Sequence, residues 1–223
     1  MILKLEDIFY KYRKDTPFIL NGVSCEFEKG KLYAVMGSSG SGKTTLISII
    51  ANLDKPTKGK IYYDGIDIST LNADEYRANK VSIIFQNYNL LYNYTAVDNI
   101  TTILNISGYK TKGNYTQRAD ELLEEVGIPK EKRNHVVQNL SGGEQQRIAI
   151  ARAIASNSEI ILADEPTGNL DKINSENIMR IFKDIILKYN KCVIIVTHSD
   201  TVASYADCNC VLNISEGKII NIE

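Results

Sequence analysis

A glycine-rich stretch between two apolar segments constrains the fold of this chain more than any other feature. The sequence GSSGSGKTT covers residues 37–45, follows the apolar run LYAVM and precedes the apolar, helix-length segment LISIIANL. Gly37, Gly42, Lys43 and Thr44 match the pattern GxxxxGK[ST], which chance produces in roughly one chain of this length in a hundred. The pattern predicts a strand, a phosphate-binding loop and a helix, in that order.

The loop predicts a nucleotide phosphate site. Glycines allow the backbone to bend so that its N–H groups converge on phosphate oxygens, and the helix N-terminus adds its dipole. Lys43 offers a positive charge to the β- and γ-phosphates, and the Thr44 hydroxyl suits the coordination shell of Mg²⁺. The expected phosphate-binding residues are Gly37, Ser38, Ser39, Gly40, Ser41, Gly42, Lys43, Thr44 and Thr45.

Further apolar runs indicate the sheet that carries this loop. VSIIF (81–85), EIILA (159–163) and CVIIVT (192–197) are continuous rather than alternating, which is typical of strands buried on both faces of a parallel sheet. Apolar residues at helical spacing lie between them, over 119–126 and 178–186. Strands that alternate with helices predict an α/β fold of the P-loop NTPase type.

The length of 223 residues suits one domain, which we expect to span 1–223. No strand pattern is visible from about 90 to 158, so we interpret this region as a helical subdomain inserted into the α/β core. The expected core covers about 1–88 and 159–223, and the expected helical subdomain covers about 89–158.

Polar residues follow three of the predicted strands directly. Asp164 and Glu165 come after IILA, Gln86 after VSIIF and His198 after CVIIVT. Taken singly, each has an ordinary explanation, such as a solvated acidic turn or a structural histidine. Because the carboxyl ends of parallel strands meet at one edge of a sheet, we expect the four side chains to converge. Asp164 is the candidate Mg²⁺ residue, and Glu165 is the candidate general base for the attacking water.

A second glycine turn opens another predicted helix at LSGGEQQR, residues 140–147. Ser141 and Glu144 fit a capping box, which explains the start of a helix but not the two glycines between them. Gly142 and Gly143 would let another group approach the backbone closely, and the N–H groups of a helix start favour an anion. One nucleotide needs one phosphate loop, so the second turn predicts a further anion contact.

The motifs together resemble those of the ATP-binding cassette (ABC) ATPases across nearly the whole chain. LSGGEQQR is similar to the signature motif of that family, and an aromatic residue, Walker A, Q-loop, signature, Walker B, D-loop and H-loop follow in the family's order. The resemblance implies a RecA-like parallel sheet core with an antiparallel β region near the N-terminus. It also implies ATP and Mg²⁺ as cofactors, with Tyr12, or else Tyr10, stacking on adenine.

The resemblance implies further roles and a second chain. Gln86 of the Q-loop would act in catalysis and near Mg²⁺, and His198 of the H-loop would act in catalysis. In such cassettes two chains pack head to tail around two ATP molecules, which implies a homodimer in the ATP-bound state. The residues that would contact the nucleotide held by the second chain are Ser141, Gly142 and Gly143, and Asp171 of the D-loop is a further expected nucleotide-binding residue.

Several segments resemble a narrower group of cassettes, the macrolide-exporter, lipoprotein-release and antimicrobial-peptide-resistance types. LADEPTGNLD and THSDTVASYAD carry this likeness, whereas Val137 stands where the group usually has a proline. The resemblance implies an ATPase that drives a separate membrane permease subunit, with a peptide, lipoprotein or antimicrobial as substrate. The alternative is a cell-division-type ATPase that signals through a membrane partner instead of transporting.

Charge and apolar patterning exclude other classes. The formal net charge is −1 with both signs spread along the chain, so no nucleic-acid partner is expected. Only about a hundred residues without sustained heptads separate the two glycine turns, which excludes the coiled-coil ATPases of DNA repair. There is no signal-peptide core and no apolar run near the ~18 residues of a membrane helix. We expect a peripheral protein on the cytoplasmic face of the plasma membrane.

The segment from Gln86 to about Ile106 is the expected contact with the permease, through the Q-loop and the helical subdomain. Apolar and aromatic residues crowd there with few charges. About half should belong to the subdomain core, and the others should form an exposed apolar groove for a short helix of the permease. The residues concerned are Tyr88, Leu90, Leu91, Tyr92 and Tyr94.

Overall fold

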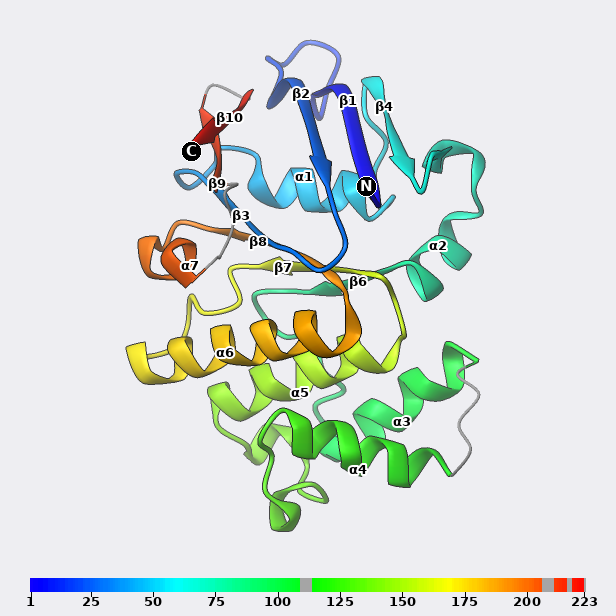
Figure 1. Cartoon of the computed structure of the whole chain (residues 1–223), viewed down its shortest axis with the longest axis vertical. Helices are drawn as coiled ribbons and strands as arrows, with labels where there is room; N and C mark the ends of the chain where they lie inside the picture. Colours follow the sequence, from blue (N-terminus) through cyan, green and yellow to red (C-terminus); the bar gives the residue numbers. More distant parts are fainter. Residues whose placement is uncertain (109–113, 206–210, 216–217, 223) are drawn as a thin grey trace.

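The chain folds into stacked α/β layers (Figure 1). This computed structural model describes residues 1–108, 114–205, 211–215 and 218–222. From the top of Figure 1 downwards, the layers are an N-terminal sheet, helix α1 (Lys43–Ile50), a central sheet and a group of helices. The α/β architecture expected from the alternation of strands and helices is confirmed.

The central sheet has six strands in the order β10-β9-β3-β8-β7-β6. Its strands β3, β6, β7, β8 and β9 are parallel, and β10 is antiparallel to β9. Every residue of β7 and β8 is buried, because helices or another sheet cover both faces. The four apolar runs of the sequence form four of these strands. The bounds are β3 (Leu32–Met36), β6 (Val81–Ile84), β7 (Ile160–Asp164), β8 (Cys192–Thr197), β9 (Val211–Ser215) and β10 (Lys218–Ile222).

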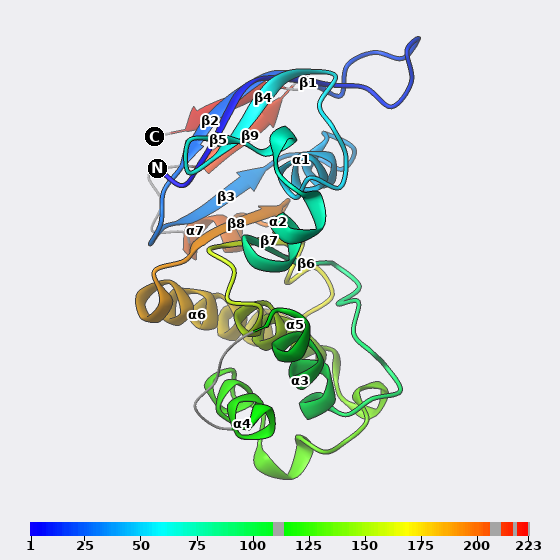
Figure 2. The same cartoon turned by 90° about the vertical axis from the view of Figure 1, so that its right-hand side faces the viewer.

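The N-terminal sheet is antiparallel, as the resemblance implied, with the strand order β2-β1-β4-β5. Its strands are β1 (Leu3–Tyr10), β2 (Leu20–Phe27), β4 (Lys58–Tyr63) and β5 (Ile66–Asp67). Helix α1 lies between this sheet and the central sheet (Figure 2), so apolar residues on more than one side of the helix are buried. The glycine-rich loop directly precedes α1 and is therefore anchored by a helix that both sheets cover.

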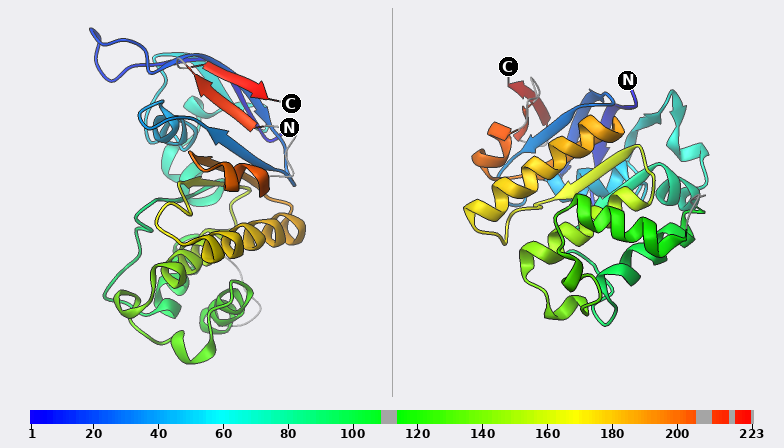
Figure 3. Two further views of the ribbon diagram at one scale, coloured as in Figure 1. Left: turned by 90° about the vertical axis from the view of Figure 1, so that its left-hand side faces the viewer. Right: turned by 60° about the horizontal axis from the view of Figure 1, so that its bottom comes forward.

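Helices cover the other face of the central sheet. In Figure 3, α5 (Gly142–Ala155) and α6 (Lys172–Tyr189) lie next to the sheet, and α3 (Ala96–Ile106) and α4 (Tyr115–Glu125) pack beyond them. Among the described residues of 89–158 there is no strand, only the isolated bridge between Thr95 and Val136. One apolar cluster contains residues of both these helices and the sheet, so the packing does not separate a helical subdomain from the α/β core. The expected subdomain division remains a prediction.

Short elements complete the described chain. They are helices α2 (Ala73–Asn79) and α7 (Asp200–Tyr205) and the 3₁₀ turns Ile68–Thr70, Lys130–Lys132 and Val137–Asn139. None of the helices in the described ranges has both the length and the apolar character that crossing a bilayer requires.

Candidate active site

The glycine-rich loop connects β3 to α1 and shapes the start of that helix. Gly42 is the N-cap of α1 with a φ of 99°, a conformation that favours glycine, and no side chain caps the helix. A Cβ at Gly42 would lie 2.9 Å from Cγ2 of Ile19, whereas a Cβ at Gly40 would meet open space. An anion can therefore take the place of the missing cap.

Polar side chains of the loop also fit an anionic ligand. The Oγ atom of Ser41 is buried and has no hydrogen-bond partner within the described ranges. Lys43 is buried, and its Nζ donates to the carbonyl oxygens of Gly37, at 2.7 Å, and Ser38, at 3.0 Å. A buried ammonium that donates to the carbonyl oxygens of its own loop can instead donate to phosphate oxygens placed in that loop.

The two acidic residues at the end of β7 have different partners. Asp164 is the last residue of the strand, and its carboxylate accepts a 2.9 Å hydrogen bond from Oγ1 of Thr44. Burial raises the pKa of Asp164, with repulsion from Glu165 in the same direction and the Thr44 hydrogen bond opposing both. Glu165 follows with a φ of 47°, which turns its side chain out of the strand and towards the neighbouring tip of β8.

Glu165 is held from three sides. Oγ1 of Thr197 donates to its Oε2 at 3.0 Å, and Nδ1 of His198 lies 2.8 Å from its Oε1. Nζ of Lys43 is 3.9 Å from the same Oε1, and the Glu165 side chain is only 12% exposed. The carboxylate is thus fixed between the loop and two adjacent strands. The expected convergence of the strand tips is confirmed for these residues.

A cavity of about 550 Å³ opens between the loop and the strand tips. Gln86, which follows β6, lines this cavity together with Asp164, Glu165 and His198. Its lining residues are Tyr12, Ile19, Ser39, Gly40, Gly42, Lys43, Thr44, Thr45, Gln86, Asp164, Glu165 and His198. The volume of the cavity and its mixture of aromatic, cationic and carboxylate groups suit a nucleoside triphosphate.

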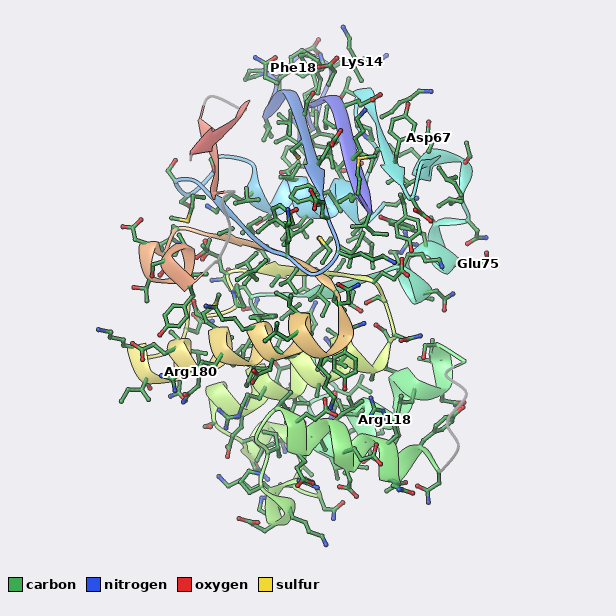
Figure 4. All side chains as sticks on the ribbon, in the orientation of Figure 1. Lys14, Phe18, Asp67, Glu75, Arg118 and Arg180 are labelled. Atoms are coloured by element: carbon green, nitrogen blue, oxygen red, sulfur yellow. The ribbon has the colours of Figure 1, made fainter. Side chains whose placement is uncertain are left out.

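Tyr12, not Tyr10, lines this cavity. Tyr12 is 65% exposed, and its hydroxyl lies 2.8 Å from Oγ1 of Thr45 in the first turn of α1. Tyr10 is buried and hydrogen-bonded to Asp54, with its ring edge against Tyr12. The loop between β1 and β2 that carries Tyr12 extends from the body, and Lys14 and Phe18 on it are labelled at the top of Figure 4. Stacking of Tyr12 on adenine therefore remains the prediction.

The second glycine turn lies outside this cavity. Ser141 caps α5 with both hydrogen bonds of the predicted capping box, and Ser141, Gly142 and Gly143 are absent from the cavity wall. Lys132 and Ser141 bond to Glu144, and although burial opposes them they lower the pKa of its carboxyl to about 2. One chain therefore does not bring the second turn to its own glycine-rich loop.

Side chains of the same chain approach both glycines of that turn. A Cβ at Gly142 would lie 3.3 Å from the hydroxyl of Tyr88, and a Cβ at Gly143 would lie 3.1 Å from Oδ1 of Asn174. The sequence interpretation assigned the glycines to the close approach of another group and to an anion, and the structure adds that two side chains of the same chain leave little room for a Cβ there. Asp171 is likewise away from the cavity, where it caps α6 by accepting bonds from the backbone and side chain of Asn174.

Sequence reasoning missed two residues that shape the site. Thr197 directly precedes His198, and its hydroxyl position at the end of a buried strand was a usable signal. Ile19 lines the cavity and touches Gly42 across the β1–β2 loop, a contact for which the sequence carries no pattern. Both act through contacts between segments that are distant along the chain.

Comparisons with known proteins agree with this geometry. The family model described as ABC transporter matches residues 20–168. An uncharacterised ABC transporter ATP-binding protein, YclH of Bacillus subtilis, is 42% identical over 208 residues, which cover 93% of this chain and 92% of YclH. The macrolide export ATP-binding/permease protein MacB of Syntrophobacter fumaroxidans is 41% identical over 212 residues, but this chain covers only 29% of its length.

A solved structure shows the same fold. The dimeric post-hydrolysis state of the ATP-binding cassette MJ0796, bound to ADP and Pi, has a TM-score of 0.87 and 35% identity over 98% of this chain and 96% of that chain. With the matched family model, the relatives and the site geometry in agreement, this chain belongs to the ABC transporter family as an ATP-hydrolysing, nucleotide-binding cassette.

Proposed function

We propose that this chain is the ATPase subunit of a transporter whose permease is a separate membrane protein. Two copies would pack head to tail around two ATP molecules and would lie against the cytoplasmic face of the plasma membrane. The observation that carries the proposal is the convergence of Lys43, Asp164, Glu165 and His198 on one cavity beside an uncapped helix start. This arrangement can bind a triphosphate and activate water against it.

Glu165 is the proposed general base. Thr197 contacts one carboxylate oxygen, and His198 and Lys43 contact the other, which orients the group so that it can accept a proton from water positioned against the γ-phosphate. The oxygen–phosphorus bond to the departing ADP then breaks while water bonds to phosphorus, and Lys43 stabilises the charge on the β- and γ-phosphate oxygens. His198 keeps Glu165 oriented and faces the cavity rim.

The residues present also fit a magnesium ion. The Thr44 hydroxyl and the Asp164 carboxylate lie 2.9 Å apart, and Gln86 adds an amide oxygen on the same cavity wall. These hard oxygen donors are the ligands that Mg²⁺ prefers when phosphate oxygens complete the shell. When bound, the ion would neutralise the developing charge on the phosphates. It would also favour the ionised form of Asp164, which burial disfavours.

A second chain is proposed because the second glycine turn has no phosphate within its own chain. Ser141, Gly142 and Gly143 open the 14-residue helix α5, with a helix dipole that favours an anion. They do not line the cavity, and neither does Asp171. A head-to-tail pair would bring these residues to the nucleotide of the other copy, and the dimeric relative MJ0796 supports that arrangement.

The permease is proposed to dock beside the Q-loop. Leu91, Tyr92 and Tyr94 are 41%, 42% and 55% exposed, whereas Leu90 is buried and Tyr88 packs against the core. An adjacent hollow of about 250 Å³ lies along β6 and α3, and the exposed Ile106 is among its lining residues. This is an apolar strip of the kind that receives an amphipathic helix.

Leu91→Asp tests the docking proposal. The isolated variant should hydrolyse ATP at the wild-type rate, because Leu91 is exposed and outside the cavity. Co-purification with the permease, or stimulation of ATPase activity by the permease in proteoliposomes, should be lost. Leu187→Asp, at an 83% exposed position on α6, is the matched control and should couple normally. Normal coupling of the Leu91 variant would place the docking surface elsewhere.

The substrate is proposed to be a peptide, a lipoprotein or an antimicrobial, exported or extracted from the membrane. The name of the relative MacB, a macrolide export protein, supports this class. The alternative is a cell-division-type regulatory cassette that signals through its membrane partner. The membrane partner would be purified together with this chain and reconstituted in vesicles. On addition of ATP, vesicles of a transporter accumulate or release substrate, and those of a signalling pair do not.

A further inference from the structure

The chain directly after Gln86 adopts an unusual backbone that a distant arginine holds in place. Tyr88 and Asn89 have φ values of 61° and 49°, in the left-handed region that non-glycine residues seldom adopt. Nη2 of Arg152 donates to the Tyr88 carbonyl at 2.8 Å, and Nη1 donates to the Asn89 carbonyl. Arg152 lies near the end of α5, so the helix that begins with the second glycine turn also fixes the loop after Gln86.

The side chain of Tyr88 returns to the beginning of that helix. Its hydroxyl would lie 3.3 Å from a Cβ at Gly142, and the nearby Asn169 side chain offsets part of the rise that burial causes in the pKa of this hydroxyl. Leu170 approaches the same face of Gly142, at 3.9 Å from that Cβ position. Tyr88 is therefore in contact with the second glycine turn and with the segment that follows Glu165.

Gln86 completes the connection to the catalytic acid. Its Nε2 atom would lie 3.7 Å from a Cβ at Gly168, whose backbone N–H donates to the Glu165 carbonyl at 3.0 Å. Alternate residues of one loop thus contact successive residues of the 168–170 segment, which leads away from Glu165. A shift of Tyr88 would be felt at Asn169 and at the second glycine turn, whereas no described contact joins Tyr88 to Glu165 itself.

We propose that Tyr88, fixed by Arg152, is a positioning residue that sets the turn Ser141–Gly143 relative to the segment 168–170. The inference rests on the proposed function, in which that turn serves the nucleotide of the second chain. It has a distinctive consequence: Tyr88 acts on hydrolysis in the partner chain's site and not on ATP binding in its own. Within the described ranges, Tyr88 contacts neither the glycine-rich loop nor Tyr12, the groups proposed to bind ATP in its own chain.

Tyr88→Phe is the conservative test because it removes only the hydroxyl. A polar contact as strong as one neutral hydrogen bond corresponds to roughly a two- to tenfold effect, so removal of this hydroxyl should lower kcat by about that factor. The affinity of the Tyr88→Phe monomer for ATP should equal that of the wild type. Tyr88→Ala should lower kcat further. Tyr189→Phe is the control, because it removes a half-buried hydroxyl that bonds Glu125 at 2.6 Å in the helical layer, far along the chain from the turn. It should keep the wild-type kcat.

Mixed dimers separate action on the partner from action within the chain. Tyr88→Ala chains are mixed with Glu165→Gln chains, and phosphate release is followed in a single turnover. In the mixed dimer, the ATP on the Tyr88→Ala chain has an intact Glu165 and faces an intact glycine turn. Hydrolysis of that ATP should therefore return to near the wild-type rate constant. Hydrolysis as slow as in Tyr88→Ala alone would overturn the inference.

The outcomes also distinguish this inference from the proposed function. If wild-type chains neither dimerise with MgATP nor hydrolyse it, the two-chain site itself is wrong. If wild-type chains do both and Tyr88→Phe matches them in kcat, only the positioning role of Tyr88 is wrong. A fall in ATP affinity of the Tyr88 variants, with kcat unchanged, would also contradict it.

Discussion

Thr197→Val should slow ATP hydrolysis without weakening ATP binding. Thr197 is fully buried at the end of β8, and its hydroxyl donates to Oε2 of Glu165 at 3.0 Å. Valine has nearly the same shape, so the variant removes the bond to Glu165 and the 3.1 Å bond that the same hydroxyl accepts from the Ser199 N–H, and it changes the packing of the core little. A hydrogen bond to a charged group contributes about 1.5–3 kcal/mol, and the lower end applies because His198 still contacts the carboxylate.

A loss of about 1.4 kcal/mol in the transition state corresponds to a tenfold lower kcat. Steady-state ATPase assays give kcat, and titration with a fluorescent ATP analogue gives the dissociation constant, which should stay constant because Thr197 does not line the cavity. Thr197→Ser keeps a hydroxyl and should retain most of the activity. A wild-type kcat in Thr197→Val, or equal losses in the serine and valine variants, would refute the orienting role of this hydroxyl.

Two further predictions follow from the site. Tyr12→Ala should weaken ATP binding by about tenfold or more, since stacking of an aromatic ring on a base is worth about 1–3 kcal/mol. Tyr10→Ala should chiefly lower thermal stability, because Tyr10 is buried. Unchanged ATP affinity in Tyr12→Ala together with weakened affinity in Tyr10→Ala would reverse the assignment. Denaturant titration should show that wild type has a larger free energy of unfolding than Glu144→Gln, with the whole difference present above pH 4.5. The difference should shrink as the pH falls towards 2, because the native pKa of Glu144 lies below its unfolded value. A difference that does not change over that range would contradict the ion pair with Lys132.

The features predicted from the sequence are those set by local patterns. The loop 37–45 and the strands that carry it follow from residue types at fixed spacing, and β3 and β8 have the bounds of the apolar runs. The apolar runs do not define the strand ends, because hydrogen bonding to neighbouring strands decides them. β6 stops at Ile84, before the expected Phe85, and β7 includes Asp164, which pairs in register with Val196 of β8.

The missed features depend on contacts between distant segments. Gly142 and Gly143 were assigned to a ligand, yet Tyr88 and Asn174 of the same chain crowd them. Those two residues lie on a loop and a helix whose approach to α5 no local pattern encodes. Thr197 differs, because its place at the end of a buried strand is visible in the sequence and only its partner, Glu165 directly after the adjacent strand, is not.

Dimer formation by Glu165→Gln tests the central claim most directly. The substitution keeps the shape of the side chain and leaves Lys43 and the phosphate loop unchanged, so ATP should still bind. Hydrolysis should fall by about 10²–10⁴-fold because the general base is lost. ATP should then remain between two chains and hold them together.

The measurement is the molar mass of Glu165→Gln by gel filtration with light scattering, with and without MgATP. The account predicts a monomer without nucleotide and a dimer with MgATP. Adding Ser141→Arg to the same variant places a bulky cation in the second glycine turn and should restore the monomer while the nucleotide site stays intact. A Glu165→Gln chain that stays monomeric at saturating MgATP, or that hydrolyses ATP at the wild-type rate, would contradict the account.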